Sequence, residues 1–141
     1  MNINRLRTLV GIPLIESMIH IGQSSDNGSL EGYVVDTSQE QIENYLSSQG
    51  VQQRRIDDLR NEFSRIGIIK NMWVDEDARG QGIGNDLMSM AIDDAYDNGA
   101  EAIILIADMG EQNEIDLVKW YESFDFQIID KAGTDYLMIL S

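Results

Sequence analysis

The stretch that most constrains the fold is residues 66–95, where a glycine-rich turn joins an apolar run to a helical pattern. The run at residues 66–74 predicts a buried strand, and the motif Arg79-Gly80-Gln81-Gly82-Ile83-Gly84 follows after an acidic turn. Glycines let the main chain come close to a ligand. The first amides of a helix have no partner within it, and the positive end of the helix dipole favours phosphate. The stretch therefore predicts a site for a phosphate-bearing cofactor.

The length of 141 residues is enough for one domain, residues 1–141.

Charge limits the partners that this chain can have. Lys+Arg 10 against Asp+Glu 25 gives a net charge of −15. A field of that sign repels nucleic acid and anionic membranes, so neither is an expected partner, and it draws polyamines, aminoglycoside-like amines or a basic protein. Solubility in a salty or crowded setting explains the same charge equally well.

Cysteine is absent, which excludes disulfides, thiolate metal sites and a cysteine nucleophile. We expect no metal site. Near the N-terminus, Arg5 and Arg7 precede an apolar run that weakly resembles a signal peptide, but Glu16 and His20 interrupt the run and no convincing cleavage site follows. No stretch is long enough to span a bilayer. We therefore expect a cytoplasmic protein.

The beginning of the chain predicts one helix and little else that is regular. Apolar spacing favours a helix over residues 12–21. His20, the only histidine, lies beside this apolar stripe, which is typical of a structural residue. Residues 23–28 have the composition of a loop, and residues 30–36 predict either a short strand or part of a turn.

Two further helices complete the first half. Thr37 or Ser38 is placed to cap a helix that ends near Ser48. Apolar residues at helical spacing predict another helix over residues 51–64. Residues 1–64 are therefore expected to be mainly helical, without a clear strand hairpin.

The second half alternates strands and helices. Both faces of the strand at residues 66–74 are apolar, which suits a sheet covered on both sides, with Ile66, Ile68, Met72 and Val74 expected on one face and Ile69 and Trp73 on the other. The order strand, helix, strand implies a right-handed crossover and an α/β class. The remaining expected elements are helices at residues 84–98 and 111–124, a strand at 102–107, and a closing hairpin of 126–130 with 136–140.

Two common phosphate-binding loops do not fit the glycine motif. A Walker loop needs Lys and Ser or Thr after its last glycine, where Asn85-Asp86 stands. The dinucleotide fingerprint needs glycine or alanine at the position of Asn85. The pattern Arg-x-x-Gly-x-Gly fits better, and it recurs here with Met72-x-Val74 before it and with Asn113, Trp120-Tyr121-Glu122 and Phe126 behind it. With these residues, the second half of the chain resembles the GNAT family of acetyl-CoA-dependent N-acetyltransferases.

The resemblance implies a GNAT-like acyl-CoA N-acyltransferase fold. In that fold a mixed central sheet is splayed between the strand at residues 66–74 and the strand at 102–107, with helices on both faces. Residues 65–141 would bind acetyl-CoA, and residues 1–64 would form a variable acceptor side. Backbone groups at Met72, Trp73 and Val74 would pair with the pantetheine arm, Asn113 would help to fix it, and the pyrophosphate would meet the amides of Arg79, Gly80, Gln81, Gly82, Ile83, Gly84 and Asn85.

The resemblance also implies the catalytic groups. The amide near Val74 would hold the developing oxyanion, and Tyr121 would protonate the leaving thiolate. The family often has a glutamate base where this chain has Lys70, so Asp108, at the end of the next strand, is our substitute candidate for the base. Asn113 stands eight rather than seven residues before Tyr121, and Asp125 replaces the usual glycine.

Two functions from different classes follow. The first is an enzyme that moves an acetyl group from acetyl-CoA to a primary amine, on a small cationic molecule or on a protein, by direct attack in a ternary complex. The second is a GNAT-like protein with an acidic surface that binds a partner and catalyses little. The glycine motif and Tyr121 favour the first function; Lys70 and the unusual first half favour the second. A homodimer is an open alternative for either.

Overall fold

The apolar runs of the chain build one mixed sheet, described by a computed structural model over residues 19–25, 27–74, 80, 82–108 and 117–141. Its strand order is β1-β2-β3-β4-β6-β5. The strands are β1 (Ile19–Ser25), β2 (Gly28–Asp36), β3 (Arg65–Val74), β4 (Ala102–Ala107), β5 (Gln127–Ala132) and β6 (Asp135–Leu140). The helices are α2 (Glu40–Ser48), α3 (Gln53–Glu62), α4 (Ile83–Asp97) and α5 (Leu117–Glu122).

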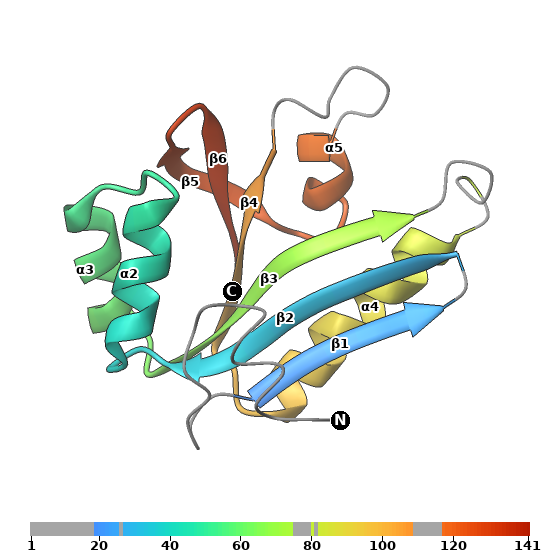
Figure 1. Cartoon of the computed structure of the whole chain (residues 1–141), viewed down its shortest axis with the longest axis horizontal. Coiled ribbons are helices and arrows are strands. Elements are labelled where there is room, and N and C mark those ends of the chain that lie inside the picture. Colours follow the sequence, from blue (N-terminus) through green and yellow to red (C-terminus); the bar gives the residue numbers. More distant parts are fainter. Residues whose placement is uncertain (1–18, 26, 75–79, 81, 109–116) are drawn as a thin grey trace.

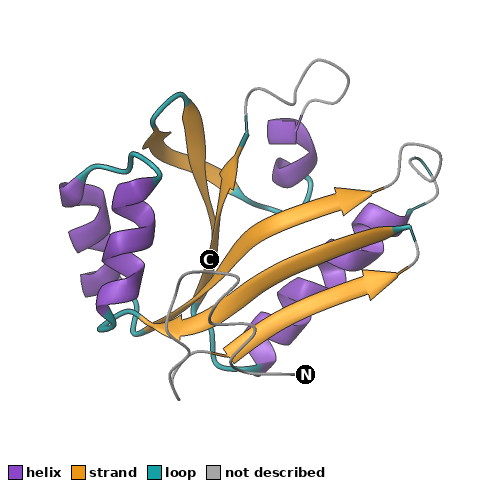
Figure 2. Ribbon diagram, in the orientation of Figure 1, coloured by secondary structure: helices purple, strands orange, loops and turns teal. Residues whose placement is uncertain are grey.

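Two buried clusters lie on opposite faces of this sheet. One joins Ile66 and Ile68 of β3 to apolar residues of α2 and α3, and we call this side the α2 face. The other joins Ile69 of β3 to α4 and to partly buried residues of α5, and we call it the α4 face. In Figure 2, α4 runs behind β1–β3, while α2 and α3 lie away from it, near the start of β3. The expected α/β class with helices on both faces is confirmed.

The sheet opens between its two parallel strands. β3 and β4 pair from Ile66, opposite Ala102, to Ile69, opposite Leu105. Beyond this point the strands diverge, as Figure 1 shows, although β3 continues to Val74 and remains paired with β2 on its other edge. The predicted splay is therefore confirmed. It leaves the carboxyl ends of β3 and β4 apart, with α5 beside them.

A bulge in β3 marks the place where the strands separate. Glu31 pairs with Asn71, while the next residue of β2, Gly32, pairs with Ile69, so Lys70 is an extra residue in β3. A bulge of this kind bends the strand and shifts the alternation of side chains beyond it. Lys70 itself lies on the α2 face, where it lines a cavity with Ile68.

The bulge overturns the predicted faces at the end of β3. Met72 packs in the cluster of the α4 face rather than with Ile66 and Ile68. Trp73 lies opposite Ser29 and is 50% exposed, so it does not share the buried face of Ile69. A strict period of two cannot reveal an inserted residue, which explains the error.

The first half of the chain contains a strand hairpin that we did not expect. β1 and β2 pair from Ile19 opposite Val34 to Ser25 opposite Gly28. The prediction of a helix over residues 12–21 is thus wrong for residues 19–21, while residues 12–18 lie outside the described residues. Residues 23–28, predicted as a loop, include the end of β1. Hydrogen-bonded pairing with β2 overrides the helical spacing of the apolar residues here.

Thr37 does not cap the following helix. The residue before α2 is Gln39, which makes no capping hydrogen bond with its side chain. Instead, the buried Thr37 hydroxyl donates to the carbonyl oxygen of Phe63 at 2.5 Å, and Arg60 Nε donates to the Thr37 carbonyl oxygen at 2.8 Å. These bonds join the start of α2 to the end of α3. Within the described residues no helix is both long and apolar enough to cross a membrane.

We predict that Gly32→Ala destabilises the fold, because a Cβ atom at this position would overlap the carbonyl oxygen of Ile68 at the bulge. Overpacking against main chain costs about 1–3 kcal/mol, measured as a lower free energy of unfolding in urea. Gly22→Ala is the control, since its Cβ would meet chiefly the movable His20 ring. Equal losses for the two variants would contradict the special role of Gly32.

Candidate active site

The glycine turn leads into α4 with two residues in the left-handed region. Gly80 has φ 85° and Gly82, the N-cap of α4, has φ 82°. A Cβ atom at either position would meet no atom of another described residue within 4 Å. No described residue crowds these two positions, and glycine is required there by the backbone conformation. Arg79 and Gln81 lie outside the described residues.

The first turn of α4 offers main-chain donors. Asp86 is the first residue whose amide bonds within the helix, to the Gly82 carbonyl oxygen at 3.0 Å. The amides of Ile83, Gly84 and Asn85 precede that bond, and such amides are available to an anion. The local geometry is therefore suitable for the predicted role of these three amides, which is to bind the pyrophosphate.

The edge of β3 that faces β4 is the second component of the site. Among the strands that the structure describes, β3 is paired past Ile69 with β2 alone. Met72, Trp73 and Val74 lie on this free stretch. An unpaired strand edge presents a row of N–H and C=O groups that can bond to an extended partner. The splay thus makes a place where an amide-bearing chain can pair with the sheet.

Tyr121 and Asp108, the two predicted catalytic residues, come close together at the open end of the sheet. Tyr121 belongs to α5 and is half-buried in the cluster of the α4 face. Burial raises the pKa of Tyr121 above the usual value for tyrosine, and the negative charge of Asp108, just beyond β4, raises this pKa further. Tyr121 is therefore protonated at neutral pH, as a proton donor must be.

Trp120 joins α5 to the start of α4. Its Nε1 donates a hydrogen bond to Asn85 Oδ1 at 2.8 Å. Its ring lies 5.3 Å from the ring of Tyr121 and 5.1 Å from that of Phe124, measured between centroids. Through these contacts, Trp120 fixes the position of Tyr121 relative to the start of α4, where the glycine turn ends. Sequence reasoning quoted Trp120 only as part of a motif and missed this contact, because the 35-residue separation of the partners leaves no local pattern.

Asp125 replaces the family's glycine without changing the backbone. It adopts φ 76°, the left-handed conformation that glycine normally supplies after a helix. The amide of Asp125 bonds to the Glu122 carbonyl oxygen at 2.9 Å, and that of Phe126 bonds to Tyr121 at 3.3 Å, as in a Schellman motif. Aspartate tolerates this conformation better than most residues. The helix that carries Tyr121 therefore ends in a backbone conformation that glycine could also adopt at this position.

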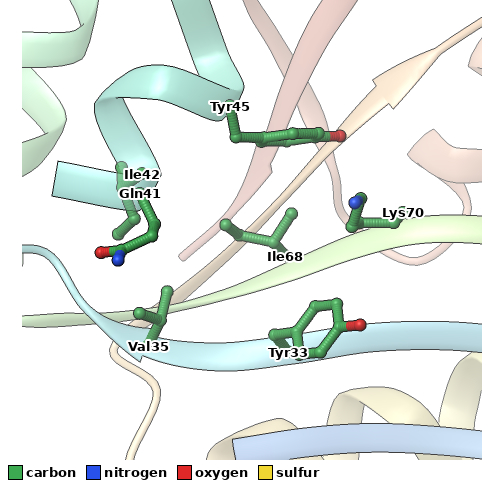
Figure 3. Close-up of a pocket in the computed structure, with 7 residues that line it drawn as sticks. All are labelled: Tyr33, Val35, Gln41, Ile42, Tyr45, Ile68 and Lys70. Atoms are coloured by element: carbon green, nitrogen blue, oxygen red, sulfur yellow. The ribbon is translucent and has the colours of Figure 1, made fainter. Parts of the chain in front are cut away.

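A small cavity lies on the α2 face, between α2 and the strands β2 and β3. Its volume is about 10 Å³, enough for roughly one water molecule. Figure 3 shows Lys70 between the rings of Tyr45 and Tyr33. Lys70 Nζ lies 5.1 Å from the centroid of the Tyr45 ring, in a cation–π contact. The lining residues are Tyr33, Val35, Gln41, Ile42, Tyr45, Ile68 and Lys70.

Asn113 is a third predicted cofactor residue, besides Arg79 and Gln81, that cannot be placed. Asn113 lies outside the described residues, as do the neighbouring residues 109–116. The prediction that it holds the cofactor arm therefore stays a prediction. His20, expected to be structural, contacts the ring of Tyr33 with centroids 5.4 Å apart.

Comparison with protein families identifies a domain. The model of the Acetyltransferase (GNAT) domain matches residues 31–128, which is more than half of the chain. No match to a curated protein is significant.

Solved structures with a similar fold include acetyltransferases from three organisms. Arabidopsis thaliana Naa50 in complex with the bisubstrate analogue CoA-Ac-MVNAL has 19% identity and a TM-score of 0.53, over 82% of this chain and 65% of that one. Thermoplasma acidophilum PaiA N-acetyltransferase in complex with coenzyme A has 14% identity and a TM-score of 0.57, over 95% and 64%. Drosophila melanogaster polyamine N-acetyltransferase, which forms N-acetylagmatine, has 11% identity and a TM-score of 0.61, over 81% and 68%. The chain thus spans slightly less than two thirds of the first two structures.

We predict that Asp108→Asn lowers the pKa of Tyr121, because the substitution removes a negative charge that disfavours tyrosinate. Tyrosinate absorbance, followed as the pH rises, measures this pKa as the difference between each protein and its Tyr121→Phe counterpart. A raised pKa also means that the Tyr121 contribution to stability is present below about pH 10 and is lost as the pH rises through the folded-state value. An unchanged titration would place Asp108 too far away to act on Tyr121.

Proposed function

Because the chain belongs to the GNAT acetyltransferase family, we propose that it transfers the acetyl group of acetyl-CoA to a primary amine by direct attack in a ternary complex. The observation that carries this proposal is the free edge of β3, which begins where its pairing with β4 ends. The open glycine turn lies at one end of that edge, and Tyr121 lies beside it. The related structures with amine acceptors support the same class of reaction.

The donor would lie along β3 and α4. The amides of residues 79–85 would hold the pyrophosphate, and open space at Gly80 and Gly82 fits such an approach. The free edge at Met72, Trp73 and Val74 would bond to the amides of the pantetheine arm, with Asn113 as a further contact. Acetyl-CoA supplies an acyl group already activated as a thioester. The Arg79 side chain would steer phosphate toward the turn.

The chemistry needs positioning and proton transfers rather than a covalent enzyme intermediate. The amine nitrogen forms a bond to the acetyl carbon, the carbon–sulfur bond breaks, and the sulfur takes a proton from Tyr121. The Val74 amide would stabilise charge on the carbonyl oxygen. Asp108, whose negative charge raises the pKa of Tyr121, is our candidate to accept the proton that the amine loses. The alternative is a GNAT-like binding protein that catalyses little, and it is favoured by Lys70, which stands where the family often has a glutamate base.

Release of free thiol tests the proposal directly. The chain is incubated with acetyl-CoA and a panel of primary amines, and cofactor binding is titrated separately. We expect binding and amine-dependent thiol release. No binding at millimolar acetyl-CoA, together with no thiol release for any amine, would overturn the enzyme function; binding without release would favour the alternative.

We predict that Gly82→Trp abolishes acetyl-CoA binding, because a large side chain would fill the cradle and a φ of 82° disfavours any side chain. The expected loss of affinity is at least about a hundredfold, measured by calorimetry. Met90→Trp is the matched control, since Met90 lies on the same helix and is 46% exposed. Retained affinity in the Gly82 variant with an intact fold would show that the cofactor site is misassigned.

We predict that Tyr121→Phe lowers turnover while leaving acetyl-CoA affinity nearly intact, because the ring keeps its packing and loses only the hydroxyl group that donates the proton. A general acid contributes typically about 10²–10⁴-fold. The measurement is kcat from initial rates beside the dissociation constant of acetyl-CoA. Tyr96→Phe is the control, because Tyr96 is 39% exposed on α4. Equal turnover in both variants would remove Tyr121 as the acid.

A further inference from the structure

We propose that Lys70 determines the class of acceptor amine, admitting amines with a neutral or acidic group near the reacting nitrogen and disfavouring diamines and polyamines. This inference rests on the proposed function, because it concerns the acceptor side of the same site. It assigns Lys70 a role in specificity rather than in catalysis.

The face from which the acceptor approaches follows from the layers of the fold. On the α4 face, the splay is flanked by α4 and by α5 with Tyr121 and Trp120. On the α2 face, the described helices pack near the start of β3, around Ile66 and Ile68. An amine that reaches the free edge of β3 from this side passes the bulge. Lys70 is the first residue of β3 after the last pair with β4.

The ammonium of Lys70 has a sheltered setting. The side chain is half-buried and borders an apolar cavity, with Nζ 5.1 Å from the centroid of the Tyr45 ring. The three ion pairs within the described part of the chain do not include Lys70. An aromatic face attracts a cation without cancelling its charge. The positive charge therefore acts on whatever binds next to it, in surroundings that screen it less than bulk water.

Glu31 is the carboxylate on the strand beside the bulge, opposite Asn71. Its Oε1 accepts a hydrogen bond from the Tyr33 hydroxyl at 3.2 Å. This bond turns the carboxylate along β2 toward Tyr33, whose ring lies below Lys70 in Figure 3. Glu31 is thus engaged with its own strand, and Lys70 is the charged group that borders the cavity.

The local charge and the overall charge of the chain have opposite effects. A net charge of −15 draws cations toward the whole surface, but this long-range attraction is screened over about 8–10 Å in physiological salt. Next to Lys70, a second ammonium on the acceptor meets a like charge at close range. An amine with a carboxylate at the same distance would instead be attracted.

Three amines that share a four-carbon chain isolate this effect: putrescine ends in a second ammonium, n-butylamine in a methyl group and γ-aminobutyrate in a carboxylate. We expect kcat/KM for γ-aminobutyrate or n-butylamine to exceed that for putrescine by at least about tenfold. Lys70→Met should remove most of this preference, and Lys70→Glu should reverse it. Lys70→Arg, which keeps the charge, should retain it.

Lys131→Met is the control for loss of a lysine elsewhere, since Lys131 is exposed on β5. Acetyl-CoA affinity, measured for each variant, reports whether the donor side is intact. Unchanged amine ratios in Lys70→Met, with normal acetyl-CoA affinity, would overturn the inference and leave the proposed function standing. Absence of acetylation for every amine, in the unmodified protein and in all variants, would overturn the proposed function and this inference together.

Discussion

The rest of the structure depends on the early end of pairing between β3 and β4. Four residue pairs hold the parallel strands together, from Ile66 to Ile69 on β3. A strand edge that is released in the middle of a sheet leaves N–H and C=O groups without a strand partner, and an extended ligand can bond to them. The glycine turn at the end of β3 and the proton-bearing Tyr121 of α5 both lie at this opening. The fold thus brings Tyr121 to the strand edge and the glycine turn, which are neighbours in the sequence but lie far from Tyr121 in it.

The bulge at Lys70 connects this opening to the acceptor side. An inserted residue increases local twist and redirects side chains, so one irregularity turns Met72 toward α4 and leaves Lys70 on the α2 face. Gly32 permits the bulge because the Ile68 carbonyl oxygen occupies the space that a Cβ atom would need. The position of Lys70 therefore depends on the main chain of β2 as well as on that of β3.

The sequence predicted the second half of the chain and the helices α2 and α3 well, and it missed the hairpin of β1 and β2, for physical reasons. Residues 84–98 were expected as a helix and form α4, whose end is followed by Gly99 with φ 92°. Such signals are local: helical spacing, a glycine stop and a glycine turn. β1, by contrast, owes its conformation to pairing with β2, and Thr37 bonds to Phe63 across 26 residues. The bulge at Lys70 and the bond from Trp120 to Asn85 likewise depend on partners that no window of sequence contains.

Two of the departures from the family pattern, Asp125 and Lys70, differ in kind, and the difference carries information about function. Asp125 adopts the left-handed conformation of the glycine that it replaces, so this substitution preserves the end of α5 and with it the placement of Tyr121. Lys70 lies in the bulge of β3 and brings a positive charge to the position where the family often has a glutamate. A reversal of charge at such a position changes which ligands bind rather than whether the site forms. The donor side, made of main-chain amides and glycines, is insensitive to such a change. We therefore expect this chain to differ from other members of the family in the amine that it accepts.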